Sequence, residues 1–178
     1  MKVLERHHDQ AIEVLSEHFK DEYITGIEIG TNAGDLTKGL LHKLPNIRKL
    51  ITVDPWEHYE GAQFEAGNPQ EYHDEQKKAA LHKLKEFGNR VRIHESESCE
   101  VFKEIWARGI VVDFCWIDGH HEKKTVESDL ANAIEVVRPG GLIGGHDYGL
   151  VDDVTKSVDE VFGDRVQKGG DFTWWVYV

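Results

Sequence analysis

The stretch ITGIEIGTNAGDLT, residues 24–37, constrains the fold more than any other part of the chain. It begins with β-branched residues that are typical of a strand buried in a parallel sheet, namely Ile24, Ile27 and Ile29. Gly30 and Gly34 then bracket a tight turn, where backbone without a Cβ can approach a ligand closely. The helical pattern that follows Asp35 has an apolar stripe of Leu36, Leu40, Leu41 and Leu44. Strand, glycine turn and helix in this order predict an α/β fold with a ligand site at the turn.

Apolar runs and helical patterns alternate along the rest of the chain. Further strands are expected at residues 49–53, 91–94, 110–117 and 142–145, with a closing β pair at 165–167 and 173–178. Helices are expected at residues 4–19, 71–87, 125–137 and 151–162, and around residues 101–106. The alternation predicts a single domain over residues 1–178 with a doubly wound α/β sheet. Residues 1–22 are expected to form an N-terminal helical extension that covers the sheet edge or the ligand.

Residues 56–70 form the longest stretch without a regular period, and they include Trp56, Tyr59 and Phe64. Aromatic residues in a long loop after a strand suggest a lid or a wall for a substrate. The alternative is a surface loop that is held in place by its own aromatic side chains.

Charge and cysteine content narrow the classes of partner. The net charge of −12 disfavours nucleic acid and anionic membranes as partners, because such a surface repels phosphate groups. Cys99 and Cys115 are not spaced as a metal or redox motif, so we expect two buried free thiols in a reducing compartment. The N-terminus has no apolar signal core and no stretch reaches the ~18 apolar residues of a spanning helix. We therefore expect a cytoplasmic protein, whose oligomeric state the sequence leaves open.

Acidic residues follow four of the expected strands. They are Glu28, Asp54, Asp118 and, in the pair His146-Asp147, Asp147. Parallel sheets bind ligands at the carboxyl ends of their strands, so these side chains are expected at one rim. Asp118, His146 and Asp147 could converge there on a divalent cation. Oxygen ligands favour Mg²⁺, Ca²⁺ or Mn²⁺, and an added imidazole shifts the preference toward Mn²⁺, Fe²⁺ or Zn²⁺. We expect Mg²⁺ or Mn²⁺ ahead of Zn²⁺ or Fe²⁺.

Asp54 follows Gly30 by 24 residues, close to the spacing between a glycine turn and a ribose-binding carboxylate. We predict that it accepts hydrogen bonds from both ribose hydroxyls of a nucleoside. The alternative is a turn-forming residue ahead of Pro55. Since the turn carries two glycines and not the three of G-x-G-x-x-G, a dinucleotide pyrophosphate is disfavoured.

Two parts of the sequence resemble the class I S-adenosylmethionine-dependent methyltransferases. Glu28, Gly30, Gly34 and Thr37 match their first motif, an acidic residue followed by G-x-x-x-G. The strings WIDGHHEKKTVESDL and RPGGLIGGHDY resemble the small O-methyltransferase-type branch, with its I-D-G-[DN]-H-x-Y-E and P-G-G-x-x-x-G-H-D-Y motifs. His120 replaces the usual Asp or Asn, and Lys123-Lys124 stands in place of Tyr-Glu.

The resemblance implies a Rossmann-like seven-stranded sheet, mostly parallel with an antiparallel C-terminal hairpin, that binds S-adenosylmethionine. The implied cofactor-binding residues are Glu28, Gly30, Thr31, Asn32, Gly34, Thr37, Asp54, Ser96, Glu97 and Asp118. The metal ligands implied by the catechol-type members are Asp118, His146 and Asp147. The implied reaction is methylation of a hydroxyl on a small molecule or sugar, with Asp118 in the catalytic group.

Proton removal from the acceptor needs a base, for which we predict His121 first and His120 second. The alternative is that both histidines only cap the next helix, as Ser96 or Ser98 could cap the preceding one. Two other functions stay open at this point. One is a catalytically silent nucleoside-binding module, and the other is a metal-dependent hydrolase or oxygenase built on the same rim.

Overall fold

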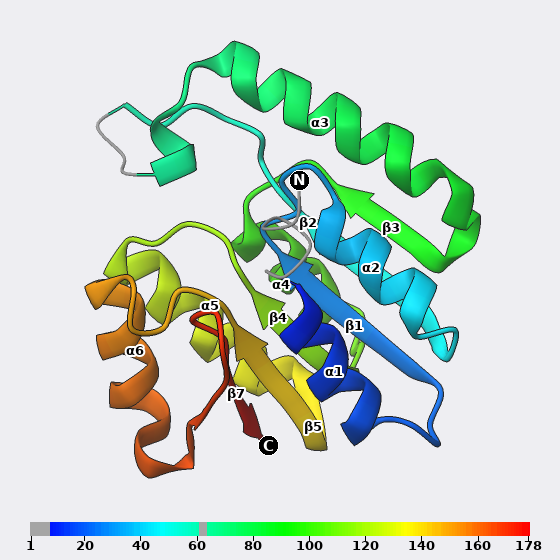
Figure 1. The fold of residues 1–178 in the computed structure, drawn as a ribbon, viewed down its shortest axis with the longest axis vertical. Coiled ribbons are helices and arrows are strands. Elements are labelled where there is room, and N and C mark those ends of the chain that lie inside the picture. The colour runs from blue at the N-terminus through cyan, green and yellow to red at the C-terminus, as the bar shows by residue number, and fades with distance from the viewer. Residues whose placement is uncertain (1–7, 61–63) are drawn as a thin grey trace.

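The computed structural model describes residues 8–60 and 64–178. Seven strands form one sheet in the order β3-β2-β1-β4-β5-β7-β6 (Figure 1). Their bounds are β1 Ile24–Ile29, β2 Ile47–Val53, β3 Val91–His94, β4 Val112–Ile117, β5 Val137–Gly145, β6 Gln167–Lys168 and β7 Trp174–Tyr177. Strands β1 to β5 pair in parallel, whereas β7 lies antiparallel between β5 and β6. The predicted fold class is confirmed, including the antiparallel C-terminal strands.

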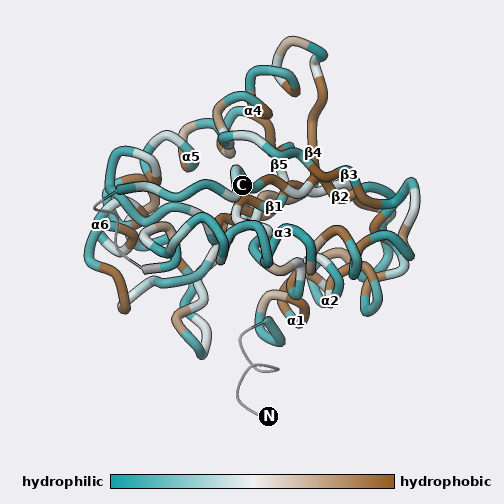
Figure 2. Tube along the Cα trace, turned by 90° about the horizontal axis from the view of Figure 1, so that it is seen from above, coloured by the Kyte–Doolittle hydropathy of each residue, from teal (hydrophilic) through white to brown (hydrophobic). Residues whose placement is uncertain are grey.

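Helices cover both faces of this sheet (Figure 2). Their bounds are α1 Asp9–His18, α2 Asp35–Lys43, α3 Gln70–Leu84, α4 Ser98–Ala107, α5 Lys123–Val136 and α6 Asp152–Phe162. Short 3₁₀ turns lie at Phe64–Gly67, Lys85–Arg90 and Gly163–Arg165. Apolar side chains of α1 and α2 form one core with the sheet, and those of α4, α5 and α6 form the other. Among the described helices, none is long and apolar enough to cross a membrane.

The N-terminal helix was expected to cover the sheet edge or the ligand. Helix α1 instead covers one face of the sheet. Its apolar stripe lies on the sheet face, where Leu15 and Phe19 pack in one cluster with Phe114 and Trp116 of β4. The reason is that Phe114 and Trp116 present large aromatic surfaces on this face, which α1 buries. The first part of the predicted helix, residues 4–7, lies outside the described residues.

Large aromatic side chains also explain the glycine pair before His146. A Cβ on Gly144 would lie 2.7 Å from the Trp116 ring, and one on Gly145 would lie 2.2 Å from the Ile117 carbonyl oxygen and 2.9 Å from Trp174 Nε1. Glycine is therefore required where β5 passes between β4 and β7.

The two cysteines differ in environment. Cys115 lies in the sheet and is fully buried, as predicted. Cys99 is only partly buried, because it lies in the first turn of α4, beside the buried Ser98 but on a more exposed side. The prediction of two buried thiols is wrong for Cys99.

A buried polar pair joins α4 to α5. The Ser98 Oγ donates to Asp129 Oδ1 at 2.5 Å, and Asp129 is 1% exposed. Removal from water raises the pKa of the Asp129 carboxyl to about 6, although the hydrogen bond from Ser98 opposes this. The ionised carboxylate is therefore a source of instability at neutral pH.

We expect Asp129→Asn to raise the free energy of unfolding at pH 7.5 by on the order of 2 kcal/mol. The folded carboxyl holds its proton more tightly than the unfolded one, so the wild type loses stability as pH rises from about 4 to about 6. Asparagine stays neutral and can still accept from Ser98, so its advantage should shrink toward pH 4.5. Urea unfolding at both pH values measures this, with the exposed Glu135→Gln on the same helix as control. A gain of equal size at both pH values would contradict the explanation.

Candidate active site

The carboxyl ends of four strands are tied to one another at a single rim. Gly30 N donates to Val53 O at 2.9 Å, Asp118 N donates to Ile29 O at 2.8 Å, and His146 N donates to Ile117 O at 3.2 Å. These bonds continue the strand ladders by one residue and place the polar strand ends side by side. We call this edge, which carries Asp54, Asp118, His146 and Asp147, the rim.

The glycine turn after β1 depends on close backbone contact. Gly30 has φ +89°, and a Cβ there would lie 1.9 Å from the Asp118 carbonyl oxygen. Gly34 has φ +78° and begins α2, with its N–H donating to Thr31 O at 2.7 Å. Asn32 between them also has positive φ, +44°. Both glycines are therefore required by conformation, and the first is required by contact as well.

Glu28 lies beneath the turn and is fully buried. Its Oε2 accepts hydrogen bonds from Thr37 and, at 2.9 Å, from Thr52, whose hydroxyl also pairs with Thr31. Burial raises the pKa of Glu28 to about 8, against the effect of these two bonds. Within the described chain, its Oε1 is a buried atom with no hydrogen-bond partner. Such an atom usually has a ligand or water as its partner.

Asp54 joins the turn to the loop that follows β2. Its Oδ2 accepts from Asn32 N and its Oδ1 from Trp56 N, both at 2.8 Å. Partial burial raises the pKa of this carboxyl, while these bonds and the nearby His73 imidazole lower it. Each carboxylate oxygen has a further lone pair, so Asp54 can still accept from a ligand.

The end of β3 and the loop before α3 meet across the rim. Glu97, exposed at the start of α4, accepts a hydrogen bond from the Tyr59 hydroxyl. The Tyr59 ring also lies 5.4 Å from the His120 ring, centroid to centroid. Ser96 is partly buried, and its Oγ has no hydrogen-bond partner in the described part of the chain. The described residues of the 56–70 loop thus contact the strand ends, although residues 61–63 lie outside the described chain.

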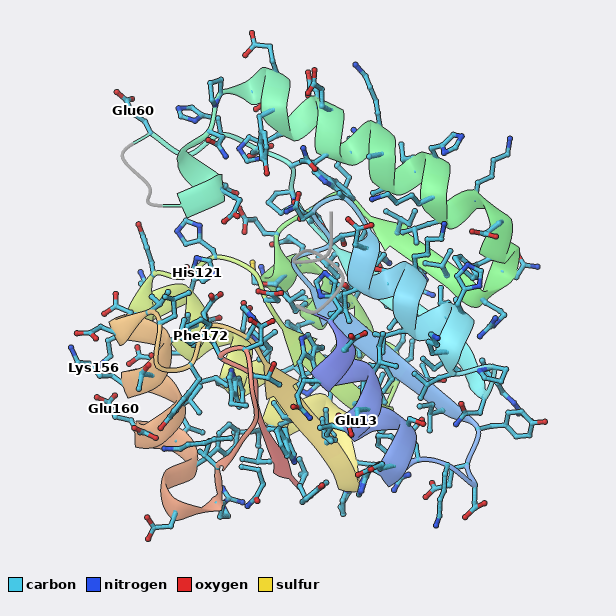
Figure 3. The ribbon with its side chains drawn as sticks, in the orientation of Figure 1. Glu13, Glu60, His121, Lys156, Glu160 and Phe172 are labelled. Carbon is cyan, nitrogen blue, oxygen red and sulfur yellow. The ribbon has the colours of Figure 1, made fainter. Side chains whose placement is uncertain are left out.

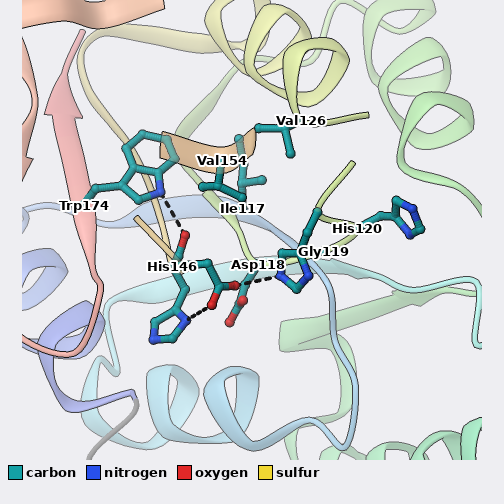
Figure 4. A pocket seen from close by; sticks show the side chains of 10 residues that line it. Ile117, Asp118, Gly119, His120, Val126, His146, Val154 and Trp174 are labelled. Atoms are coloured by element: carbon teal, nitrogen blue, oxygen red, sulfur yellow. Dashed lines mark hydrogen bonds and ion pairs between the residues drawn. The ribbon is translucent and has the colours of Figure 1, made fainter. Parts of the chain in front are cut away.

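A chain of acids and imidazoles lies at the ends of β4 and β5 (Figure 4). His121 Nε2 lies 2.7 Å from Asp147 Oδ2, and His146 Nδ1 lies 3.2 Å from Asp147 Oδ1. His146 Nε2 is 3.8 Å from Asp171 Oδ2. Asp147 therefore lies between two imidazoles, in a backbone conformation with φ +66° that non-glycine residues rarely adopt.

The structure groups different residues for a cation than the sequence analysis did. Ligand atoms of Asp118, His121 and Asp147 all lie within 4.8 Å of one another, and His146 is not in this group. Instead His146 extends toward Asp171 and the Phe172 ring, whose centroid is 6.4 Å from its own. The strand has ended at this point and Asp147 has a positive φ, so the two side chains do not alternate as in a strand, and His146 Nδ1 faces the Asp147 carboxylate. The group of Asp118, His121 and Asp147 is called the rim triad below.

Burial and close charges shift the pKa values around the rim triad. Burial raises the pKa of Asp118 to about 6, against the positive charge of His146. Burial opposes the charged form of His146, but the hydrogen bond to Asp147 and the nearby carboxylates raise its pKa to about 9. Burial also opposes the charged form of His121, but its hydrogen bond to Asp147 raises its pKa. The two imidazoles together hold the pKa of Asp147 well below its usual range, despite burial. At neutral pH, Asp147 is therefore a carboxylate and His146 an imidazolium.

A cavity of about 10 Å³ adjoins the rim triad, with room for about one water molecule or ion. Its polar side is formed by Asp118, His121, His146 and Asp147, and its apolar side by Ile117, Val126, Val154 and Trp174. Figure 4 shows His120 apart from the hydrogen-bonded side chains, in agreement with its 3.6 Å ion pair to the exposed Glu122.

A family model described as a methyltransferase domain matches residues 27–148, which include the glycine turn and the rim triad. The chain belongs to this family. The match confirms the resemblance to the class I methyltransferases that the sequence motifs indicate. No curated protein matches the sequence.

Solved structures of methyltransferases share the fold. The calicheamicin methyltransferase CalS11 superposes with a TM-score of 0.72 at 11% identity, over 94% of this chain and 77% of that one. The O-methyltransferase TomG from Streptomyces achromogenes, in complex with S-adenosylmethionine, gives 0.64 at 16% identity, over 95% and 78%. A putative O-methyltransferase from Klebsiella pneumoniae gives 0.63 at 20% identity, over 95% and 79%. These similarities confirm the Rossmann-like methyltransferase fold.

We expect Gly30→Ala to destabilise the methyltransferase by about 3 kcal/mol or more, because the added methyl group would overlap the Asp118 carbonyl. Gly149→Ala is the matched control, since its φ of +82° is similar but nothing lies within 4 Å of its Cβ position. That variant should lose only about 1 kcal/mol. Urea unfolding of both variants measures the difference. Equal losses would show that backbone strain, and not contact with Asp118, explains the glycine.

Proposed function

We propose that this methyltransferase transfers a methyl group from S-adenosylmethionine to a hydroxyl group of a small molecule or sugar. The observation that carries the proposal is the position of the glycine turn beside the rim triad. The close approach of Gly30 to Asp118 brings the glycine turn and the rim triad to adjacent strand ends. A donor and an acceptor bound at this rim would lie next to each other.

The residues present fit the cofactor. The turn of residues 30–34, with positive φ at Gly30, Asn32 and Gly34, is bound through Asn32 to Asp54, which has further lone pairs for ribose hydroxyls. The buried Oε1 of Glu28 has no partner in the described chain and could interact with the cofactor's ammonium group. S-adenosylmethionine would supply an electrophilic methyl group on a positively charged sulfur, which suits a rim rich in carboxylates.

The chain's own contribution to the reaction is proton removal from the acceptor. We assign this role to His121, because the 2.7 Å contact of its Nε2 with Asp147 Oδ2 orients the imidazole and would stabilise the imidazolium that forms. His146 is already protonated at neutral pH and keeps Asp147 charged. His120, the second candidate from the sequence, pairs with Glu122 and has less support.

Aromatic side chains lie beside His120 and His146 at this rim, which favours a ring-shaped acceptor. Phe172 is 42% exposed beside His146, and Figure 3 shows it at the same end of the molecule as His121. Tyr59 lies against His120, which follows β4. Small-molecule sites commonly combine aromatic walls with a few directed polar groups. A sugar or aromatic alcohol between Phe172 and Tyr59 fits this description.

A divalent cation held by the rim triad is a second version of the site. Two carboxylates and one imidazole suit Mn²⁺, Fe²⁺ or Zn²⁺, and Mg²⁺ less well. A cation there would lower the pKa of a bound hydroxyl, and His121 would then be a ligand and not the base. Metal analysis of the purified protein, with and without chelator, distinguishes the two versions.

Binding of the cofactor product tests the donor site. We expect S-adenosylhomocysteine to bind in the micromolar range, and Asp54→Asn to weaken it by about 10- to 100-fold through loss of a charged acceptor. Titration calorimetry measures both values. The exposed Asp164→Asn, at Gly163–Arg165, is the control and should bind like the wild type. Failure of the wild type to bind either S-adenosylmethionine or its product would rule out the proposed function.

Methyl transfer tests the base. We expect His121→Gln to lower kcat by about 10²- to 10⁴-fold with S-adenosylhomocysteine affinity unchanged within about twofold, since His121 acts on the acceptor. Release of S-adenosylhomocysteine with a panel of sugars and aromatic alcohols provides the assay. His120→Gln is the matched control and should retain most activity. A larger loss in His120→Gln than in His121→Gln would reverse the assignment, and tight cofactor binding without turnover would favour a binding module.

A further inference from the structure

One face of α3 packs against the glycine turn. The buried residues of this helix, His73, Ala80 and Leu84, are spaced by seven and four positions and share one stripe. A Cβ on Gly34 would lie 3.2 Å from Ala80 Cα and 3.4 Å from Leu84 Cδ1. Since each residue adds ~1.5 Å along a helix, His73 lies about 10 Å further along the same stripe.

The first turn of α3 is bound to the loop that follows Asp54. Gln70 Nε2 donates to Trp56 O at 2.9 Å, and Gln70 Oε1 accepts from His58 N at 3.1 Å. Trp56 in turn donates its backbone N–H to Asp54 and, at 3.0 Å, its indole N–H to Asn32 O. Gln70 and His73 are three residues apart and therefore share a helix face. The face that carries His73 is thus directed toward Asp54.

His73 is a buried polar side chain whose hydrogen-bonding capacity is not fully used. It is 7% exposed, and its Nε2 has no hydrogen-bond partner in the described chain. Burial raises the pKa of the Asp54 carboxyl, and the nearby His73 imidazole is among the groups that oppose this rise. The packing of α3 does not require an imidazole here, because Ala80 and Leu84 on the same stripe are apolar. A polar group that arrives from outside the chain would give Nε2 its partner.

We propose that His73 is a second residue of the nucleoside subsite, whose Nε2 forms a hydrogen bond to a ribose hydroxyl that is also bound by Asp54. The inference rests on the proposed function and extends it. A hydroxyl can donate its proton to the Asp54 carboxylate and still accept a hydrogen bond from an imidazole N–H. Asp54 alone can only accept, so His73 supplies the donor that completes the recognition of the ribose.

Titration of S-adenosylhomocysteine into wild type, His73→Phe and His73→Gln tests the proposal. His73→Phe keeps a ring of similar size but removes the nitrogens, and we expect about 5- to 10-fold weaker binding. His73→Gln keeps a polar group on this face and should recover part of that loss. The exposed His82 lies on the same helix, and His82→Gln should bind like the wild type.

Analogues of S-adenosylhomocysteine that lack the 2′- or the 3′-hydroxyl separate direct contact from support of the fold. If His73 contacts one hydroxyl, the penalty for removing that hydroxyl should be several-fold smaller in His73→Phe than in wild type, with His73→Gln between the two. Should His73→Phe not fold, His73→Ala takes its place with the same analogues. A phenylalanine or alanine variant that binds S-adenosylhomocysteine like the wild type, or that loses affinity equally for all three ligands, would overturn the proposed role of His73 and leave the proposed function standing. A wild type that binds none of them would overturn the proposed function as well.

Discussion

The close contact between Gly30 and the Asp118 carbonyl is the constraint on which the rest of the structure depends. A Cβ at residue 30 would lie 1.9 Å from that oxygen, so only glycine lets the ends of β1 and β4 come this close. The contact fixes the distance between the glycine turn and the rim triad. In a methyltransferase this distance has chemical meaning, because the donated methyl group must reach an acceptor held at the next strand end.

Electrostatic compensation keeps the rim compatible with a packed core. Asp147 is charged despite its burial because imidazoles approach both of its oxygens, and His146 is in turn surrounded by carboxylates. The pKa of Glu28 shifts in the opposite direction to that of Asp147. Complete burial raises it to about 8, because hydrogen bonds from two threonine hydroxyls do not offset the loss of water. The rim therefore holds charge in pairs, while the residue beneath the turn is mostly neutral at pH 7. A positively charged ligand at the rim would therefore be attracted by the charged carboxylates there, whereas Glu28 could offer it an uncharged hydrogen-bond acceptor.

The sequence predicts the parts of this structure that follow from local patterns. Strands, helices and the glycine turn have clear periodicity, and parallel strands necessarily bring Asp54, Asp118 and Asp147 to one rim. The sequence could not predict that His121, and not His146, lies in one group with Asp118 and Asp147. This grouping depends on the positive φ of Asp147 and on Asp171, which comes from a loop distant in the sequence. The position of α1 depends on Phe114 and Trp116, which the periodicity of residues 4–19 does not reveal. His73 was missed because it stands in a charge-rich helix, and only the packing of α3 on Gly34 shows that its side is buried.

Strand β7 follows every other strand along the chain, yet it lies inside the sheet between β5 and β6. Its Trp174 donates a hydrogen bond to His146 O and lines the apolar side of the cavity beside the rim triad. During synthesis, Asp118, His121 and Asp147 therefore leave the ribosome before Trp174, which lines the cavity beside them. A nascent chain can form the glycine turn and the strands from β1 to β4 early, whereas the rim at the end of β5 is complete only after β7 inserts. The order of synthesis thus separates the formation of the two ends of the rim.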